Sequence, residues 1–555
     1  MPRSNERRGL GAVLIGAFVL AAGSQGYKQV VAKDDVMERA RATNRFVVTR
    51  TEYARRGSIL SADGKVLAQS NDTFELSINY KKVPKSRAFF MAMSEASGIP
   101  AIEMLVPAET GGTSRTWQSP MSGARADRIR EVKGDWRADG ISLRRVPRRD
   151  YPLSDVADTL VGYASEGKPL TGLEESQNSI LAGEPGSLSG LVDRTGAFLP
   201  MRMEGEASKA IHGSDITLTI DSSLQVAATA AVRKAVESNN ADQGVAIAVD
   251  PATGDVLAAA SWINGRDRAA ENGFNPIVMG RFEPGSTFKI LTLAKALDDG
   301  VVGNRDVVHC AGVIHVANKD IKCSHGAHGT VNNEKAIAES CNISALIWAR
   351  KIGRDNFVDF MRKAGLFDKT NLGLPGEIPG YYNPEDGSPT LQVANMGFGQ
   401  ALNLTPIGLV SAYAALANDG VRLTPKLIAR VGNRATPRSK SAQVVSGETA
   451  AQMMHLMEAT IQADYGTGHR LRIPGYRLGG KTGTAQKLGR GWNQERPKYV
   501  SNFVGYVPIE KPRAVVLVMI DNPKAGAYYG GSVAGPVFKE IAQAVIKRYN
   551  IPKSE

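Results

Sequence analysis

Three short segments, widely separated in this chain of 555 residues, place the strongest constraint on its fold. Each combines hydroxyl, amine or carboxamide side chains. They are Ser286-Thr-Phe-Lys289, Ser340-Cys-Asn342 and Lys481-Thr-Gly-Thr484. Each is weak alone, because such triplets occur by chance in many helices, turns and loops. Their joint occurrence in this order, with glycines beside the third, predicts a fold that brings all three to one pocket.

The first segment pairs a nucleophile with a base. A serine hydroxyl is a poor nucleophile at neutral pH unless a base lies within hydrogen-bond reach. Pro284-Gly285 predicts a turn that feeds a helix, and residues three apart on a helix share a face, which brings Lys289 beside Ser286. Burial among apolar neighbours and a second cation, Lys481, favour the neutral amine. Lys289 is therefore the predicted general base.

The other two segments are predicted to form the remaining walls of the pocket. Ser340 offers a hydroxyl that can relay a proton, and Asn342 offers a carboxamide that donates and accepts. They interrupt a helix-like run over residues 336–350. Residues 479–485 suit a strand that a ligand backbone approaches closely, because small residues leave room for a peptide. The residues predicted to hold this peptide and its carboxylate are Lys481, Thr482, Gly483 and Thr484.

The N-terminal sequence predicts a segment that targets the chain to a membrane. Arginines precede a charge-free apolar run from Gly9 to Gly23, and the charge-free length reaches Tyr27. This length favours a membrane anchor over residues 9–29, with residues 1–8 cytoplasmic and the rest extracytoplasmic, because basic flanks stay inside. A cleaved signal peptide is the alternative.

The net charge of +13 would ordinarily indicate a nucleic-acid partner. An exported chain meets anionic lipids and wall polymers instead, so no nucleic-acid partner is expected.

Two of the three cysteines are candidates for a disulfide in an exported protein. Cys310 and Cys323 bracket two strand-like stretches, residues 312–316 and 320–322, so a hairpin is expected to bring their thiols opposite each other. Cys341 is expected to be a buried free thiol.

The two cysteines also have two histidines nearby, and the spacing of this set is loosely like that of a zinc site. The set is Cys310, Cys323, His325 and His328. The intervening residues suit a hairpin better than a zinc finger, and acylation by a serine–lysine pair requires no metal. We therefore expect no metal and no cofactor, and expect His325 and His328 to shape a loop above the site.

The region from about residue 45 to 205 is broken by turns and predicts a β-rich, non-catalytic domain. Segments 74–80 and 141–146 alternate as strands do, and residues 56–68 suit a hairpin with an Asp-Gly turn. That hairpin has the form R-G-x-I-x-x-x-x-G-x-x-L-A and resembles the opening of the class B, monofunctional penicillin-binding proteins. Further landmarks of that family follow in the same order. They are Tyr151-Pro152, Val161-Gly-Tyr163, Gly172-Leu-Glu174 and Val192-Asp-Arg-Thr-Gly196.

The second half of the chain predicts an antiparallel sheet with helices on both sides. Its length also suggests more than one domain. The expected strands are residues 217–220, 244–249, 256–261 and 514–520, and the expected helices are residues 224–238 and 534–545. The resemblance implies an α+β fold. One transmembrane helix comes first, then a β-rich pedestal domain, residues 30–205. A transpeptidase domain of the penicillin-binding and serine β-lactamase type follows, residues 206–555.

The resemblance also implies the reaction, which is D,D-transpeptidation of peptidoglycan. Ser286 would attack the penultimate D-Ala of a stem peptide, with Lys289 as general base, Ser340, Asn342 and Lys481 as further catalytic residues, and the backbone N–H groups of Ser286 and Thr484 as oxyanion hole. β-Lactams would acylate the same serine. A hydrolase, either a D,D-carboxypeptidase or a β-lactamase, and a scaffold that activates a SEDS-family glycan polymerase are the alternatives.

The implied partners are stem peptides, β-lactams, the cytoplasmic (inner) membrane, a SEDS-family polymerase and other membrane proteins of division or elongation. Moderate length and the short spacing from Gly172 to Val192 favour the division-type branch over the elongation type.

Overall fold

The computed structural model describes most of the chain, with short gaps. The described residues are 23–24, 47–165, 168–192, 198–200, 208–265, 273–324, 326–385, 388–487 and 498–554. Contacts group the chain into two compact units, residues 1–55 with 182–213, and residues 56–181 with 214–555. Within the described ranges, no helix is both long and apolar enough to cross a membrane. The predicted anchor, residues 9–29, lies outside these ranges except for residues 23 and 24.

The smaller unit is built on an antiparallel sheet with strand order β1-β8-β9. Its strands are β1 (Val47–Glu52), β8 (Gly186–Val192) and β9 (Phe198–Pro200). The register pairs Val47 with Leu191 and Glu52 with Gly186.

The larger unit contains the five-stranded antiparallel sheet on which the candidate site is built, with strand order β12-β11-β25-β24-β23. The strands are β11 (Gln243–Val249), β12 (Val256–Ile263), β23 (Gly479–Lys487), β24 (Lys498–Val507) and β25 (Ala514–Asp521). The predicted hairpin of 244–249 with 256–261 and the apolar strand 514–520 are confirmed. Both faces of β25 are buried, which explains its unbroken apolar sequence.

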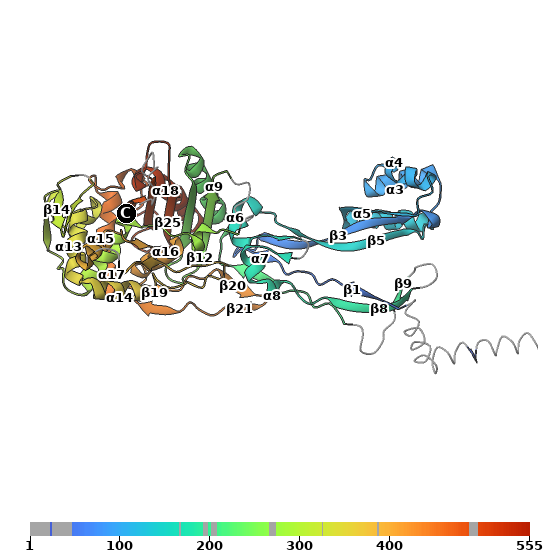
Figure 1. The fold of residues 1–555 in the computed structure, drawn as a ribbon, viewed down its shortest axis with the longest axis horizontal. Coiled ribbons are helices and arrows are strands. Elements are labelled where there is room, and N and C mark those ends of the chain that lie inside the picture. The colour runs from blue at the N-terminus through green and yellow to red at the C-terminus, as the bar shows by residue number, and fades with distance from the viewer. Residues whose placement is uncertain are drawn as a thin grey trace, which may run out of the picture. The chain divides into compact units, whose positions relative to one another are not determined.

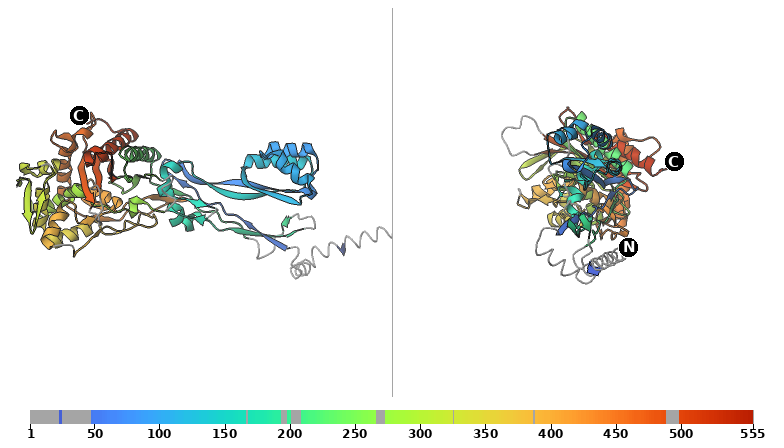
Figure 2. Two further views of the ribbon diagram at one scale, coloured as in Figure 1. Left: turned by 45° about the horizontal axis from the view of Figure 1, so that its top comes forward. Right: turned by 90° about the vertical axis from the view of Figure 1, so that its right-hand side faces the viewer.

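Helices cover both faces of this sheet (Figures 1 and 2). Helices α9 (Ser222–Ser238) and α18 (Gly530–Arg548) pack against each other and on one face, which confirms the predicted helices 224–238 and 534–545. Helices α16 (Pro406–Leu416) and α17 (Gly447–Gln462) contact the sheet on its other face, where they belong to a second apolar core. Alternate residues of β11 point to the two cores, Val245 and Ile247 to one and Ala246 and Ala248 to the other.

A second sheet contains the strands predicted for the first half of the chain. Its members include β2 (Ile59–Leu60), β3 (Val66–Asn79), β4 (Ser114–Ser122), β5 (Ile141–Asp150) and β10 (Ile216–Leu218). The predicted hairpin of residues 56–68 is confirmed, because Ile59 pairs with Ala68. The predicted strands 74–80 and 141–146 are also confirmed, and they pair with each other as β3 and β5. Helices α3 (Arg87–Ser97), α4 (Ala101–Glu109) and α5 (Gly123–Asp135) share an apolar core with β3–β5.

Two of the family landmarks, Tyr151-Pro152 and Gly172-Leu-Glu174, meet Arg56 of the first hairpin at one buried ionic cluster. Arg56 Nε and Arg149 Nε donate to the two carboxylate oxygens of Glu174, at 2.5 and 2.7 Å, and the Glu174 side chain is fully buried. Tyr151 OH accepts a hydrogen bond from Ala164 N at 2.7 Å and lies 3.5 Å from Glu174 Oε1. One carboxylate therefore ties together segments that lie more than a hundred residues apart.

Candidate active site

Ser286 lies in a short 3₁₀ turn, Gly285–Phe288, that leads into helix α11 (Lys289–Asp298). The sequence predicted a helix here, and the structure adds that its first turn is 3₁₀. Because a 3₁₀ helix has three residues per turn, Ser286 and Lys289 fall on the same face. Gly285 has φ +56° and a Cβ at this position would lie 2.8 Å from Thr484 O, so the turn and the third motif meet closely at this glycine.

Lys289 joins the first motif to the second. Its side chain is fully buried, and Nζ donates hydrogen bonds to Ser340 O at 2.7 Å, Ser340 Oγ at 3.1 Å and Asn342 Oδ1 at 2.5 Å. Among the residues the structure describes, no hydrogen bond joins Ser286 Oγ to Lys289 Nζ. Catalytic hydrogen bonds of this kind commonly tighten only when substrate is bound.

Burial shifts the pKa of both lysines of the site. Burial lowers the pKa of Lys289 to about 8, and the sulfur atoms of three nearby cysteines oppose this shift in part. Burial also holds the pKa of Lys481 well below its ordinary value, and the charge of Lys289 acts in the same direction. The effect of a second cation, predicted for Lys289, therefore falls on Lys481.

The second motif forms a tight turn between two helices, as predicted. Helix α12 (Asn333–Ala338) ends before it and α13 (Asn342–Ile352) begins with its asparagine. Ser340 has φ +62°, a left-handed conformation that a non-glycine residue rarely adopts and that clusters at functional sites. Asn342 Nδ2 donates to Lys322 O at 2.8 Å, and Cys341 caps α13 by accepting from Ser344 N at 3.4 Å. The turn is therefore held on several sides.

The third motif lies on β23, the outermost strand at one edge of the sheet, as predicted. Lys481 is fully buried and its Nζ donates to Thr482 O at 3.1 Å and to Thr482 Oγ1 at 3.3 Å. Thr482 Oγ1 also lies 2.9 Å from Thr467 Oγ1, and Thr484 Oγ1 accepts from Gly530 N at 3.0 Å. Both threonine hydroxyls are thus fixed in orientation.

The glycines of this strand have a different role from the one predicted. A Cβ at Gly480 would lie 2.4 Å from Val504 O, and a Cβ at Gly483 would lie 2.3 Å from Asn502 Oδ1. Both positions are closed by neighbouring parts of the protein, so glycine there permits close internal packing. Asn502 in turn donates through Nδ2 to Pro284 O at 3.1 Å, which links this packing to the turn that carries Ser286.

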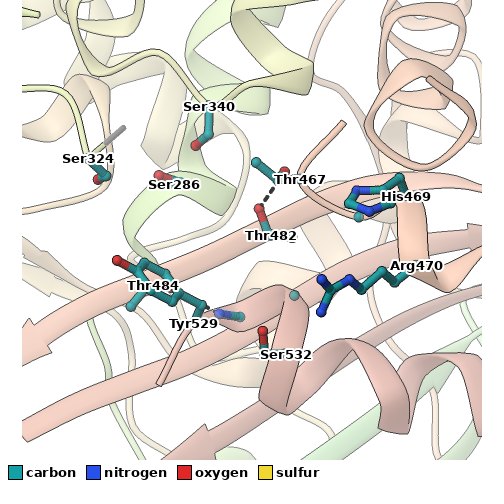
Figure 3. Close-up of a pocket in the computed structure, with 13 residues that line it drawn as sticks. Ser286, Ser324, Ser340, Thr467, His469, Arg470, Thr482, Thr484, Tyr529 and Ser532 are labelled. Carbon is teal, nitrogen blue, oxygen red and sulfur yellow. Dashed lines mark hydrogen bonds between the residues drawn. The ribbon is translucent and has the colours of Figure 1, made fainter. Parts of the chain in front are cut away.

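A cavity of about 310 Å³ connects the three motifs (Figure 3). Ser286, Ser340, Thr482 and Thr484 line it. The rest of the lining was not predicted from the sequence, and it consists of Ser324, Thr467, Gly468, His469, Arg470, Tyr529, Gly530, Gly531 and Ser532. Arg470 adds an exposed cation at this wall, and no pattern in its local sequence distinguishes it from other surface arginines.

The predicted disulfide is not formed in the structure. The hairpin is confirmed as β14 (Val313–Val316) with β15 (Lys319–Lys322), but Cys310 Sγ and Cys323 Sγ are free thiols 3.6 Å apart, beyond the roughly 2.05 Å of a disulfide bond. Cys341, buried and free as predicted, has its Sγ 3.7 Å from Cys323 Sγ. His328 Nδ1 lies 3.3 Å from Cys310 Sγ, and His325 lies outside the described residues.

Comparisons with known families cover both halves of the chain. Residues 244–543 match the family described as penicillin binding protein transpeptidase domain, and residues 51–218 match the penicillin-binding protein dimerisation domain. The first match alone covers more than half of the 555 residues.

Curated relatives and solved structures agree with these matches. The penicillin-binding protein PbpB of Mycolicibacterium smegmatis is 32% identical over 75% of this chain and 67% of its own length, so this chain spans about two thirds of that relative. The probable peptidoglycan D,D-transpeptidase PenA of Neisseria meningitidis is 30% identical over 95% and 90%. The peptidoglycan D,D-transpeptidase FtsI of Escherichia coli K12 is 29% identical over 97% and 92%. A crystal structure of penicillin binding protein 3 from Mycobacterium tuberculosis, complexed with aztreonam, superposes with a TM-score of 0.69 at 27% identity, over 91% of this chain and 98% of that one.

Proposed function

The chain belongs to the class B penicillin-binding proteins, and we propose that it cross-links peptidoglycan as a D,D-transpeptidase through an acyl-enzyme at Ser286. The observation that carries this proposal is the burial of Lys289 between Ser340 and Asn342, one helical turn from Ser286, beside a cavity that all three motifs line or border. A buried amine with a lowered pKa can accept the serine proton near neutral pH, as a general base must.

In acylation, Ser286 Oγ forms a bond to the penultimate D-Ala carbonyl carbon while its proton passes to Lys289. The developing oxyanion takes hydrogen bonds from the backbone N–H groups of Ser286 and Thr484. Collapse of the intermediate breaks the peptide bond, and the departing D-Ala amine takes the proton back through Lys289 and the Ser340 hydroxyl. The products of this half-reaction are an ester at Ser286 and free D-Ala.

In the second half-reaction, an amine of a neighbouring stem peptide attacks the ester carbonyl. The amine loses its proton to the same lysine, and Ser286 recovers a proton as it leaves. The new amide is the cross-link. β-Lactams follow the first half-reaction because their amide takes the place of the D-Ala-D-Ala bond, and the ester they leave is expected to hydrolyse slowly.

The substrate carboxylate is proposed to bind at the β23 wall, through Lys481, Thr482, the backbone of Gly483, and Thr484. The two threonine hydroxyls are already oriented by hydrogen bonds, so they lose little freedom on binding. The free edge of β23 offers backbone groups to an extended peptide.

We extend the proposal to the setting of the enzyme. Residues 9–29 would anchor the chain in the bacterial cytoplasmic membrane, with the pedestal, residues 30–205, and the catalytic domain, residues 206–555, outside it. A SEDS-family glycan polymerase and other division proteins would be its membrane partners, and the division-type branch is favoured by the short spacing from Gly172 to Val192.

Labelling with a fluorescent penicillin tests the nucleophile. The full chain and two serine variants, Ser286→Ala and Ser324→Ala, are labelled and the adduct is mapped by mass spectrometry. Ser324 lines the same cavity outside the motifs and is the matched control. We expect an adduct on Ser286 in the unchanged chain and in Ser324→Ala, and none in folded Ser286→Ala. An adduct that persists in Ser286→Ala would overturn the assignment.

A further inference from the structure

Four side chains with metal-binding chemistry converge beside the second motif. The ligand atoms of Cys310, Cys323, His328 and Cys341 all lie within 4.8 Å of one another. They come from three segments, namely the end of β13 (Val307–Cys310), the loop between β15 and β16 (Gly329–Asn332), which carries Cys323 and His328, and the turn before α13. Within the described ranges, this is the one group of its kind.

The spacing of the atoms fits a tetrahedral zinc ion. Zn–S bonds of about 2.3 Å place the sulfurs of a tetrahedral site about 3.8 Å apart, and a sulfur and a histidine nitrogen about 3.5 Å apart. The observed separations are 3.6 Å for Cys310 Sγ to Cys323 Sγ, 3.7 Å for Cys323 Sγ to Cys341 Sγ and 3.3 Å for Cys310 Sγ to His328 Nδ1. A structural zinc site with three cysteines and one histidine is a common ligand set.

The surroundings favour thiolate sulfur. Backbone amides donate to two of the sulfurs, Asn342 N to Cys323 Sγ at 3.2 Å and Ser344 N to Cys341 Sγ at 3.4 Å. Both amides belong to the first turn of α13, where the helix dipole stabilises negative charge. The three sulfurs are buried, so three thiolates without a cation would be costly here.

A disulfide accounts for these contacts less well than a metal does. A Cys310–Cys323 bond would use two of the four groups and would not explain why Cys341 and His328 lie against them. The Nε2 atom of His328 is buried and has no hydrogen-bond partner among the described residues, so the ring is not held there by a protein acceptor. Ligation explains why the ring lies against sulfur.

We propose that Cys310, Cys323, His328 and Cys341 bind one Zn²⁺ as a structural site that fixes the Ser340-Cys-Asn342 turn. Binding forms three Zn–S bonds and one Zn–N bond, and the three thiol protons pass to water. Cys341 lies between Ser340 and Asn342, so the metal ties the left-handed turn to the end of β13 and to the loop between β15 and β16. The four ligands are positioning residues, and the metal takes no part in acyl transfer.

Metal analysis of the purified full chain, without added reductant or chelator, tests the site directly. We expect about one zinc per chain, three free thiols after denaturation in the presence of chelator, and a ligand-to-metal charge-transfer band when cobalt replaces zinc. Cys310→Ser and His328→Ala should lower zinc affinity by more than about 100-fold. His315 is an exposed histidine in the β14–β15 hairpin, between Cys310 and Cys323 in the sequence. His315→Ala is therefore the matched control and should keep the metal.

The proposal fails if the unchanged chain contains no bound metal, whether its thiols are then free or Cys310 and Cys323 are oxidised to a disulfide. This outcome does not depend on whether the variants fold. Ser286→Ala separates this proposal from the proposed function, because it should keep the zinc while it loses penicillin labelling.

The positioning role has its own measurement. Removal of zinc from the unchanged chain by a chelator should slow acylation by a fluorescent penicillin at least about tenfold, and added zinc should restore the rate. An acylation rate that does not change when zinc is removed would overturn the positioning role and leave the site a purely structural one.

Discussion

Two of the places where the larger unit buries charged side chains treat the charge in opposite ways. At Glu174, one carboxylate receives Arg56 and Arg149 together, so two cations share one buried anion. At the candidate site, Lys289 and Lys481 are both fully buried, and within the described ranges neither has a carboxylate partner. Lys289 Nζ instead donates hydrogen bonds to a carbonyl, a hydroxyl and a carboxamide oxygen.

The difference separates structural charge from catalytic charge. A buried charge with an opposite partner stays ionised and holds its segments together, and loss of either partner leaves an uncompensated charge. A buried cation among neutral dipoles loses its proton more readily, which is why burial lowers the pKa of Lys289 to about 8. The first arrangement is expected to govern stability, and the second to govern rate.

Replacement of Lys289 should give the largest effect. In Lys289→Met, Ser286 loses its base, so we expect acylation by a fluorescent penicillin to slow by about 10³- to 10⁴-fold. The free energy of unfolding should change by less than about 2 kcal/mol, because a buried amine without a carboxylate partner is replaced by an apolar side chain of similar length. Stopped-flow labelling and urea denaturation measure the two quantities. A variant that keeps its acylation rate would show that the base lies elsewhere.

Replacement of Glu174 should give the opposite result. Glu174→Gln leaves two arginines around a neutral group, and we expect the free energy of unfolding to fall by about 3–5 kcal/mol. The acylation rate of the folded fraction should stay unchanged. Glu175 is exposed and follows Glu174 in helix α7 (Gly172–Ser176). Glu175→Gln is therefore the matched control and should have little effect. If Glu174→Gln slowed acylation and left stability intact, the proposed division of roles would be wrong.

The pH dependence of acylation should report the titration of Lys289, the buried amine without a carboxylate partner. Below about pH 8, Lys289 is protonated in the folded chain and the rate should fall about tenfold per pH unit, whereas above it the rate should level off. The groups that face this amine are Ser340, Asn342, Lys481 and the three cysteines. The residual rate of Lys289→Met should lack this step, and a step that survives in the variant would assign the titration to another group.

The free energy of unfolding should also depend on the protonation of Lys289. The pKa of Lys289 falls from 10.5 to about 8 on folding, so the unfolded chain binds more protons between these values. The contribution of Lys289 to stability therefore rises with pH across this window. Denaturation of the unchanged chain and of Lys289→Met at several pH values between them isolates this contribution.

Patterns that repeat along the chain predicted much of the fold. Alternation identified β3 and β5, two apolar runs around a turn identified the β11–β12 hairpin, and helical runs identified α9 and α18. The three motifs predicted the site, because their spacing within each segment reflects one turn of helix or alternate positions on a strand. Features that depend on contacts between distant segments were not visible in this way.

The misses share that physical reason. The sequence suggested that Gly483 leaves room for ligand, whereas Asn502, nineteen positions later, occupies the space. Nor did the spacing of Cys310, Cys323 and two histidines show that Cys341 of the second motif lies beside Cys310, Cys323 and His328. Register across strands decides such contacts, and a single sequence does not encode that register in any local pattern.

The smallest expected effect concerns the edge of the Glu174 cluster. Tyr151 OH accepts a good hydrogen bond from Ala164 N at 2.7 Å but lies 3.5 Å from Glu174 Oε1, at the limit of a hydrogen bond. Tyr151→Phe should therefore cost about 1 kcal/mol of unfolding free energy, through the amide left without an acceptor. Tyr163→Phe, whose ring packs against Tyr151, is the control. In a double-mutant cycle with Glu174→Gln, we expect a coupling below about 0.5 kcal/mol, and a larger coupling would make Tyr151 a member of the charge network.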